Sequence, residues 1–242
     1  MTIIAYLDCF AGISGDMFLG ALVDAGWSAE RLREVVAALQ LSNVTIEVSR
    51  ASKQGIGGAQ VTIKAAGDQS ARAYSDLVSM ITQAPLPAAV QHQALDILKL
   101  LGETEAAIHS VPLEEIHFHE LGAVDTLVDI VGVLVGLRDL GIAQVYSSPL
   151  PWSKGTVNTA HGLLPVPPPA VAALLQGIPV VGVEVQGEMV TPTGAVLVRS
   201  VAQGFGPIPD MRVERVGYGA GERNWPDRPN LLRIVIGQGV QA

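Results

Sequence analysis

The sequence predicts an α/β or α+β fold, in which a mixed β-sheet is flanked by helices and the middle section of the chain is helical. Short apolar segments are followed by glycine-bearing loops and then by helical periodicity, as in βα units. Two neighbouring segments alternate apolar and polar residues instead, as hairpin strands do. The 242 residues contain no internal repeat and are 49% hydrophobic and only 16% charged. This composition predicts one large domain with a substantial core, and it favours an oligomer or a partner domain.

The N-terminal part predicts a strand, a loop and two helices, followed by a hairpin. Residues 2–7 are short and apolar, as in a buried strand, and the helix expected at residues 17–26 ends at a glycine. A second helix, residues 28–40, begins at a serine suited to capping. Residues 43–50 and 59–64 alternate in polarity around the turn-rich sequence SKQGIGG, so they predict paired strands.

The remaining elements are predicted by the same local patterns. Between residues 149 and 170 the sequence is rich in proline, which excludes a central strand or a helix interior and predicts a fixed loop. The further expected helices are residues 74–83, 87–109, 116–137, 171–176 and 195–203. The further expected strands are residues 143–148, 180–185, 211–216 and 231–236.

The chain is organised around residues 116–137, an almost unbroken apolar stretch that predicts a buried helix. Its apolar part contains only two carboxylates, Asp125 and Asp129, which are four apart and therefore share a helix face. Gly132 and Gly136 continue the same stripe, and we expect them to pack closely against the central sheet. Because buried carboxylates need partners, this face predicts a nearby metal, ligand or other part of the chain.

A polar cluster precedes this helix and offers metal ligands. His117 and His119 are two apart, so on an extended segment both imidazoles point the same way, and Glu120 follows directly. These nitrogen and oxygen donors suit nickel, zinc or another divalent metal, and Asp125 or Asp129 would complete or orient the set. The alternative is that the histidines cap the helix and bond its first turn.

The loop after the first strand has features of an anion site. Asp8, Ser14, Gly15 and Asp16 lie between a strand and a helix start, where free amides and the helix dipole converge. The loop lacks the lysine of a P-loop and does not match GxGxxG. The alternative is an ordinary connection between strand and helix, with Ser14 as the helix cap.

A second loop-to-helix junction and two loops nearby supply further candidates. Thr191, Thr193 and Gly194 form a candidate oxyanion or phosphate cradle, or else a simple helix cap. His161 precedes the proline run as a candidate ligand or acid/base group. Arg223, in a loop shaped by glycine and proline, could grip an anion in forked fashion or pair with a neighbouring carboxylate.

The overall charge and the single cysteine exclude several classes of protein. A net charge of −8 argues against a nucleic-acid ligand. Cys9 stands alone, so an intramolecular disulfide framework is excluded and a reducing cytoplasm is expected. The sequence shows neither a signal peptide nor an apolar run that would span a membrane. We therefore expect a cytoplasmic protein.

Several long stretches, in order along the chain, resemble one family. They are FAGISGDM (10–17), HFHELGAVDTLVDIVG (117–132), GTVNTAHGLLPVPPPA (155–170), TPTGA (191–195) and GYGAGERNWPDRPN (217–230). Together they resemble LarC, the nickel insertion protein of nickel-pincer nucleotide cofactor biosynthesis. Members are usually longer, so residues 1–242 resemble the N-terminal domain alone, with a helical subsection at 70–115. The C-terminal domain that carries the CTP site in the family is then absent.

The resemblance implies a cyclometallase, classed as a lyase. Such an enzyme inserts Ni²⁺ into pyridinium-3,5-bisthiocarboxylic acid mononucleotide, forming carbon–nickel and sulfur–nickel bonds. The family reaction consumes CTP, needs Mn²⁺ or Mg²⁺, and serves lactate racemase and related enzymes. The implied partners are this small-molecule substrate, a C-terminal domain in the same or a separate chain, and further copies in a homo-oligomer.

With this reaction in view we hypothesise roles for the candidate residues, because ligand-type side chains are concentrated in the most family-like stretch. The candidates to hold or deliver nickel are His117, His119 and Glu120. The candidates to complete its shell, or to take up the displaced pyridinium proton, are Asp125, Asp129 and His161. The candidates for the substrate's phosphate and carboxylates are Asp8, Ser14, Gly15, Asp16, Thr191, Thr193, Gly194 and Arg223.

Two other functions are compatible with the same sequence. In the first, this domain is a non-catalytic scaffold that mediates assembly while the C-terminal domain performs the chemistry, as the low charge fraction would favour. In the second, the carboxylate-bearing first loop belongs to a metal-dependent phosphohydrolase.

Overall fold

A computed structural model describes residues 2–66, 72–118 and 123–240 of the chain. The central sheet contains β1 (Ile3–Asp8), β2 (Val44–Lys53), β3 (Ile56–Ala65), β6 (Gln144–Ser147), β11 (Ala202–Phe205), β12 (Met211–Ala220) and β13 (Leu231–Gly239). Their order is β11-β6-β1-β13-β12-β3-β2. The β1–β6 and β6–β11 pairs are parallel, whereas β13 runs antiparallel to both of its neighbours. The expected mixed sheet, and with it the α/β fold class, is confirmed.

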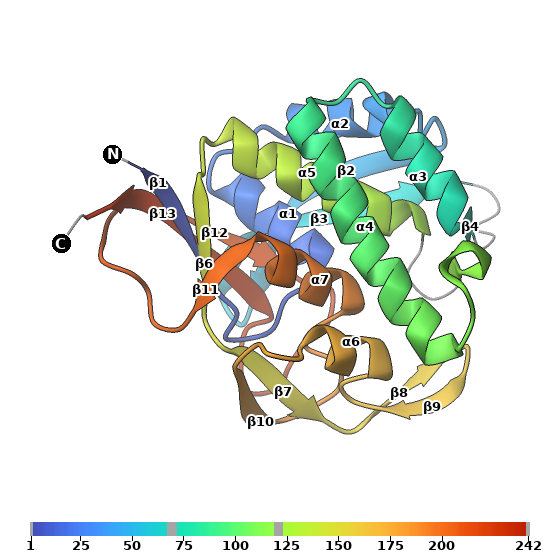
Figure 1. Cartoon of the computed structure of the whole chain (residues 1–242). Coiled ribbons are helices and arrows are strands. Elements are labelled where there is room, and N and C mark those ends of the chain that lie inside the picture. Colours follow the sequence, from blue (N-terminus) through green and yellow to red (C-terminus); the bar gives the residue numbers. More distant parts are fainter. Residues whose placement is uncertain (1, 67–71, 119–122, 241–242) are drawn as a thin grey trace.

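The helices are α1 (Gly15–Asp24), α2 (Ala29–Ala38), α3 (Tyr74–Gln83), α4 (Ala88–His109), α5 (Ala123–Asp139), α6 (Pro169–Leu174) and α7 (Pro192–Val201), with a short 3₁₀ turn at Leu113–Glu115. They form layers on one side of the sheet (Figure 1). Helix α1 lies directly on β3, β12 and β13, α5 packs onto α1, and α4 covers α5. No helix in the described part of the chain is long and apolar enough to cross a membrane.

Helix α1 approaches the sheet unusually closely. A side chain at Gly219 of β12 would place its Cβ 1.8 Å from the carbonyl oxygen of Met17, and one at Gly217 would meet the oxygen of Ala21 at 2.2 Å. Glycine at these positions of β12 therefore allows backbone contact between helix and strand. This contact fixes the N-terminal end of α1 relative to the loop that follows β12.

Helix α5 is the buried helix that its sequence predicts, since nearly every apolar residue on it is inaccessible to solvent. The expected role of its glycines was wrong in one respect. A Cβ at Gly132 would meet Leu19 and Leu32, and one at Gly136 would meet Leu22, so both glycines face α1 and α2 rather than the sheet. The reason is that α1 lies between α5 and the strands.

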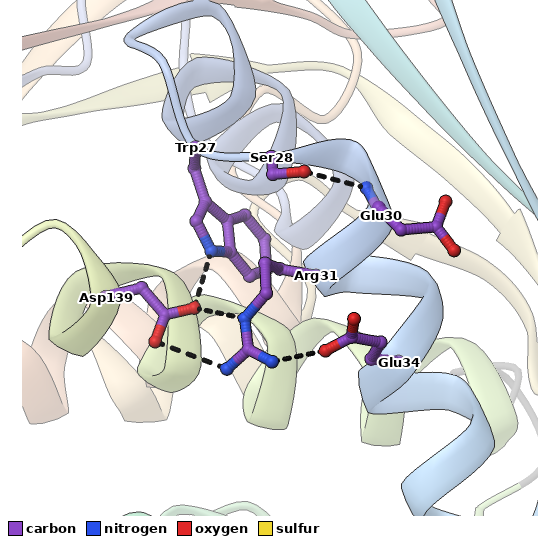
Figure 2. Close-up of polar contacts among 6 residues, drawn as sticks. All are labelled: Trp27, Ser28, Glu30, Arg31, Glu34 and Asp139. Atoms are coloured by element: carbon purple, nitrogen blue, oxygen red, sulfur yellow. Dashed lines mark hydrogen bonds and ion pairs between the residues drawn. The ribbon is translucent and has the colours of Figure 1, made fainter.

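The end of α5 is fixed to α2 by a polar network (Figure 2). The indole nitrogen of Trp27 and Nε of Arg31 each donate to Oδ2 of Asp139 at 3.0 Å. Burial raises the pKa of Asp139, but these hydrogen bonds outweigh it and lower the pKa overall. At the start of α2, the Ser28 hydroxyl accepts from the Glu30 amide at 3.2 Å, which confirms the expected cap.

The proline-rich passage at residues 149–170 is not the loop that its sequence predicts. It contains β7 (Leu150–Lys154), which pairs with β10 (Val180–Gln186), and the hairpin of β8 (Thr156–Thr159) with β9 (Gly162–Pro165). Each of these sheets has two strands, so every strand is an edge strand, where proline is tolerated. Together with α6, these two small sheets form a region that lies beneath α4 and α7 in Figure 1, with α6 packed against both helices.

The remaining expectations are met with shifted boundaries. The hairpin of β2 and β3 is confirmed and is longer at its turn than the alternation predicts. Strand β12 continues to Ala220, and β11 takes up residues expected to end α7. A short strand, β4 (Arg72–Ala73), pairs with β5 (His117–Phe118). The expected helical middle section corresponds to α3 and α4.

Candidate functional site

The loop after β1 is held by the segment that precedes α7. The Ile13 amide donates to the carbonyl of Met189 at 3.0 Å, and the Thr191 amide donates to the carbonyl of Ile13 at 3.1 Å. Gly12 has φ +101°, and a Cβ there would lie 1.9 Å from the Met189 oxygen, so glycine is required for this approach. The two loop-to-helix junctions that the sequence singles out are thus joined.

The residues of the second junction mainly build the structure. The Thr191 hydroxyl accepts from the Gly194 amide at 3.1 Å and caps α7. A Cβ at Gly194 would lie 2.2 Å from the Ile13 oxygen, and Thr193 is buried. The capping interpretation is therefore satisfied here, and of this junction only Thr191 reaches the cavity described below.

The start of α1 is covered by a carboxylate from α5. A Cβ on Gly15 would lie 1.9 Å from Oδ2 of Asp129, so Asp129 packs directly on the glycine backbone. Ser14 occupies the cap position, but its side chain makes no capping bond and instead donates to Oδ1 of Asp16. The N-terminus of α1 therefore faces carboxylates of the chain itself.

These groups line a cavity of about 280 Å³ between α1, α5, β3 and the loop after β12. Its walls carry carboxylates from four parts of the chain that are distant in sequence. They are Asp16, Asp125, Asp129, Glu188 and Glu222. Arg223 is the one basic residue among the described residues that line it.

The pKa of each of the three aspartates is raised, mainly by burial and in addition by neighbouring carboxylates. Asp129 is only 7% exposed, and burial raises its pKa well above the usual range, with further contributions from Asp16 and Asp125. Burial, Asp16 and Glu222 raise the pKa of Asp125. Burial likewise raises the pKa of Asp16, although the hydrogen bond from Ser14 opposes it. The cluster therefore resists carrying three negative charges at once.

No basic group of the described chain neutralises this cluster at close range. Arg223 lies 3.5 Å from the carboxylate of Glu188, so its charge is directed to that residue. Oδ1 of Asp129 is buried and has no hydrogen-bond partner among the described residues. A buried oxygen of this kind is costly unless a proton or a cation meets it. The arrangement thus fits a proton or a positively charged ligand better than an isolated phosphate.

The structure brings together part of the predicted site. Ser14, Asp16, Asp125, Asp129, Thr191 and Arg223 line the one cavity, and Gly15 lies directly behind it. Asp8 lies elsewhere, where Nε of Arg233 donates to it at 3.0 Å. His161 lines a second cavity, described below.

The predicted metal cluster is only partly within the described residues. His117 lies in β5, is exposed, and lines neither cavity. His119 and Glu120 fall outside the described residues. Within residues 2–66, 72–118 and 123–240, no group of three or more histidine, cysteine, aspartate or glutamate side chains is arranged to hold a metal ion.

Several lining residues are absent from the predicted site, and three of the polar or aromatic ones come from a single loop: Glu222, Trp225 and Asn230. All three belong to the loop GERNWPDRPN, from which the sequence predicts only Arg223 as a ligand. The indole nitrogen of Trp225 is buried without a hydrogen-bond partner among the described residues, and Asn230 donates to the carbonyl of Arg223 at 3.0 Å. The sequence feature that could have identified these residues is the presence of a tryptophan and an asparagine in a loop rich in glycine and proline.

Comparison with known proteins gives one consistent result. Residues 5–242 match the family described as nickel insertion protein. A putative nickel insertion protein of Citrifermentans bemidjiense is 48% identical over 241 residues, covering 99% of this chain and 62% of its own. A protein of Desulfitobacterium hafniense, named pyridinium-3,5-bisthiocarboxylic acid mononucleotide nickel insertion protein, is 49% identical over 97% of this chain and 58% of its own.

A protein of the same name from Geobacillus kaustophilus is 42% identical, covering 97% of this chain and 60% of its own. The chain thus spans about three-fifths of the length of these relatives. No solved structure matches it.

Proposed function

Because this chain belongs to the nickel insertion protein family, we propose that it takes part in inserting Ni²⁺ into pyridinium-3,5-bisthiocarboxylic acid mononucleotide. Its 49% identity to the Desulfitobacterium protein of that name, over nearly its whole length, supports this substrate. The proposed reaction consumes CTP and needs Mn²⁺ or Mg²⁺, as the resemblance to LarC implies. The product would serve lactate racemase and related enzymes.

The observation that carries the proposal is the buried carboxylate cluster around Asp129. When nickel replaces a hydrogen on the pyridinium ring, the carbon–hydrogen bond breaks and its electron pair forms the carbon–nickel bond. The proton must pass to a base. Asp129 is buried and its pKa is raised well above the usual range, so it holds a proton more readily than an ordinary carboxylate does. We assign proton uptake to Asp129, and Asp125, which is less buried, lies one turn away on the same helix.

The charge of the cavity also limits how the substrate enters. The mononucleotide carries a phosphate and two thiocarboxylates, which carboxylate walls repel. Ni²⁺ between the aspartates and the sulfur atoms would relieve this repulsion. In this arrangement Arg223, whose side chain is 47% exposed, would hold the phosphate at the mouth, with the hydroxyls of Ser14 and Thr191 beside it. Gly15, Thr193 and Gly194 then shape the loops, and Asp8 has no direct role.

The sequence also predicts nickel delivery by His117, His119 and Glu120. His117 is close in sequence to the start of α5, which carries Asp125 and Asp129, so a short connection would join a delivery element to the cavity. This role remains a prediction, because two of the three residues lie outside the described part of the chain.

Replacing Asp129 by asparagine tests the proposal. The variant keeps the shape of the side chain but cannot accept the ring proton, so we expect insertion to slow by about 100-fold or more, as for loss of a general base. Nickel insertion would be measured with CTP and Mn²⁺. The assay would use this chain either fused to, or mixed with, the additional segment that its longer relatives contain. Asp76→Asn, on the exposed side of α3, is the matched control. If Asp129→Asn inserts nickel at the unaltered rate, Asp129 is not the base that takes up the ring proton.

A further inference from the structure

A second cavity, of about 620 Å³, contains a pair of histidines that the proposed reaction does not use. His109 is the last residue of α4, and His161 lies in the turn between β8 and β9. Their ring centroids are 4.7 Å apart and the ring planes are tilted by 49°. The fold thus brings two of the five histidines of the chain into contact from positions 52 residues apart.

Burial does not account for this contact. His161 is exposed and the side chain of His109 is 34% exposed, so neither ring belongs to the core, and little apolar area is removed from water where they meet. Both rings instead line the cavity wall. Two imidazole rings this close together at a cavity wall suggest a shared ligand, and imidazole is the commonest metal ligand in proteins.

A carboxylate lies behind the pair. Oε2 of Glu105, one helical turn before His109, is 3.6 Å from Nε2 of that ring, and Glu105 also lines the cavity. A carboxylate next to one ring nitrogen favours the tautomer that keeps its proton there, which leaves the other nitrogen as a ligand. Glu105 therefore has the place of a residue that orients a metal-binding histidine.

The second cavity adjoins the carboxylate cavity. Glu188 lines both, and the segment that carries it continues into Met189, which is bonded to the loop before α1. An ion bound at the histidines would therefore have a carboxylate between it and the three aspartates. The histidine cavity adds imidazole nitrogen donors to carboxylates, whereas the carboxylate cavity has no histidine among the described residues that line it.

We propose that His109 and His161, positioned by Glu105, capture incoming Ni²⁺ before it passes to the carboxylate cavity. Imidazole nitrogens suit nickel, and two such ligands leave the other coordination positions of the ion to water or to the sulfur atoms of the substrate. A site that passes its ion onward needs open coordination positions, since a complete set of protein ligands would retain the ion. The identity of the ion rests on the proposed function.

Titration of the chain with Ni²⁺ alone, without substrate or nucleotide, tests the capture site. Affinity would be measured by calorimetry or by competition with a coloured chelator, and the bound histidines would be identified by paramagnetic broadening of their imidazole NMR signals. We expect His109→Ala and His161→Ala each to weaken binding at least tenfold, and the His109 and His161 signals to broaden first. His92→Ala, on the exposed face of the same helix, is the matched control and should change nothing.

His109→Gln and His161→Gln repeat the test with less disturbance of the cavity, and circular dichroism would verify that each variant is folded. Unchanged nickel affinity in these folded variants, or binding lost only on replacing His117 and His119, would overturn the capture site. Neither result bears on Asp129, whose test is the insertion rate. Conversely, loss of nickel binding in the histidine variants together with normal insertion by Asp129→Asn would retain the capture site and remove the proposed role of Asp129.

Discussion

Replacing Gly15 by alanine should destabilise the protein through a single contact. The new Cβ would lie 1.9 Å from Oδ2, 2.2 Å from Cγ and 2.6 Å from Cβ of Asp129, whereas carbon atoms in contact prefer about 3.5–4.0 Å. Asp129 is 7% exposed and has little room to move away. Overpacking of this kind costs about 1–3 kcal/mol. Alanine favours the helix by at most about 1 kcal/mol over glycine, so repulsion prevails.

The expected net loss is about 2 kcal/mol in the free energy of unfolding. For a chain of this size that corresponds to a fall in Tm of roughly 4–8 °C. Urea unfolding followed by tryptophan fluorescence, together with a thermal melt, would measure both quantities. Gly182→Ala in β10 is the matched control, because a Cβ there meets nothing within 4 Å and its stability should change by less than about 0.5 kcal/mol.

A second substitution identifies the contact. Asp129→Gly removes all three atoms that the new Cβ at position 15 would strike, so the double variant should be more stable than the sum of the single effects by roughly 1–3 kcal/mol. Should Gly15→Ala prove as stable as Gly182→Ala, the start of α1 would not be covered by Asp129. The glycine would then be open to a phosphate, as the sequence alone suggests.

Three further predictions concern buried polar groups. Since the pKa of Asp129 is raised on folding, its ionisation opposes folding above about pH 4, so Asp129→Asn should be the more stable protein at pH 7. The difference in unfolding free energy between the two proteins, measured in urea, should shrink as the pH falls towards 4. A difference that does not change with pH would contradict this. Burial raises the pKa of Cys9 to about 12, so a thiol reagent at pH 8 should modify the folded protein on the order of 10³-fold more slowly than the unfolded one, and equal rates would refute the assignment. Asp139→Ala leaves the buried indole N–H of Trp27 without its acceptor and should lower the unfolding free energy by about 1–3 kcal/mol in a denaturant titration, whereas a change below about 0.5 kcal/mol would show that the network is dispensable.

The fold class was predictable because it depends on local patterns, whereas the sheet order was not. The alternation in β2 and β3 and the apolar run of α5 each specify an element from its own residues. The placement of β13 between β1 and β12 depends on pairing such as Tyr6 with Val235, more than 200 residues apart. No local pattern encodes such a register. Strand β11, with the sequence AQGF, offers no alternation at all and was missed.

The proline-rich passage shows how a correct rule can give a wrong element. Proline excludes residues from a central strand, but it does not exclude them from a two-stranded ribbon, where each strand has a free edge. Pro165 ends β9 opposite Thr156, at the open end of the hairpin. Whether a strand is central or at an edge is a property of the sheet, so the sequence of the segment alone does not decide it.

The candidate site was predictable as far as spacing within one helix allows. Asp125 and Asp129 are four apart, and the structure confirms that both face the same cavity. What they face depends on α1, which brings Asp16, and on the loop after β12, which brings Glu222. Asp16 lies more than 100 positions from the pair, at a helix start, and Glu222 lies more than 90 positions from it, in a loop. Neither segment contains a metal-binding motif.

The charges of the cavity determine the order in which ligands can enter. Three aspartates whose pKa values are already raised by burial and by neighbouring carboxylates would meet the proposed anionic mononucleotide only at a further electrostatic cost. A divalent cation would remove that cost, because its positive charge offsets the repulsion between the carboxylates and the anion. The metal must therefore precede the anion, or arrive with it. The proposed histidine pair would meet that requirement, because Glu188 lines both its cavity and the carboxylate cavity, so the cation would be supplied next to the aspartates.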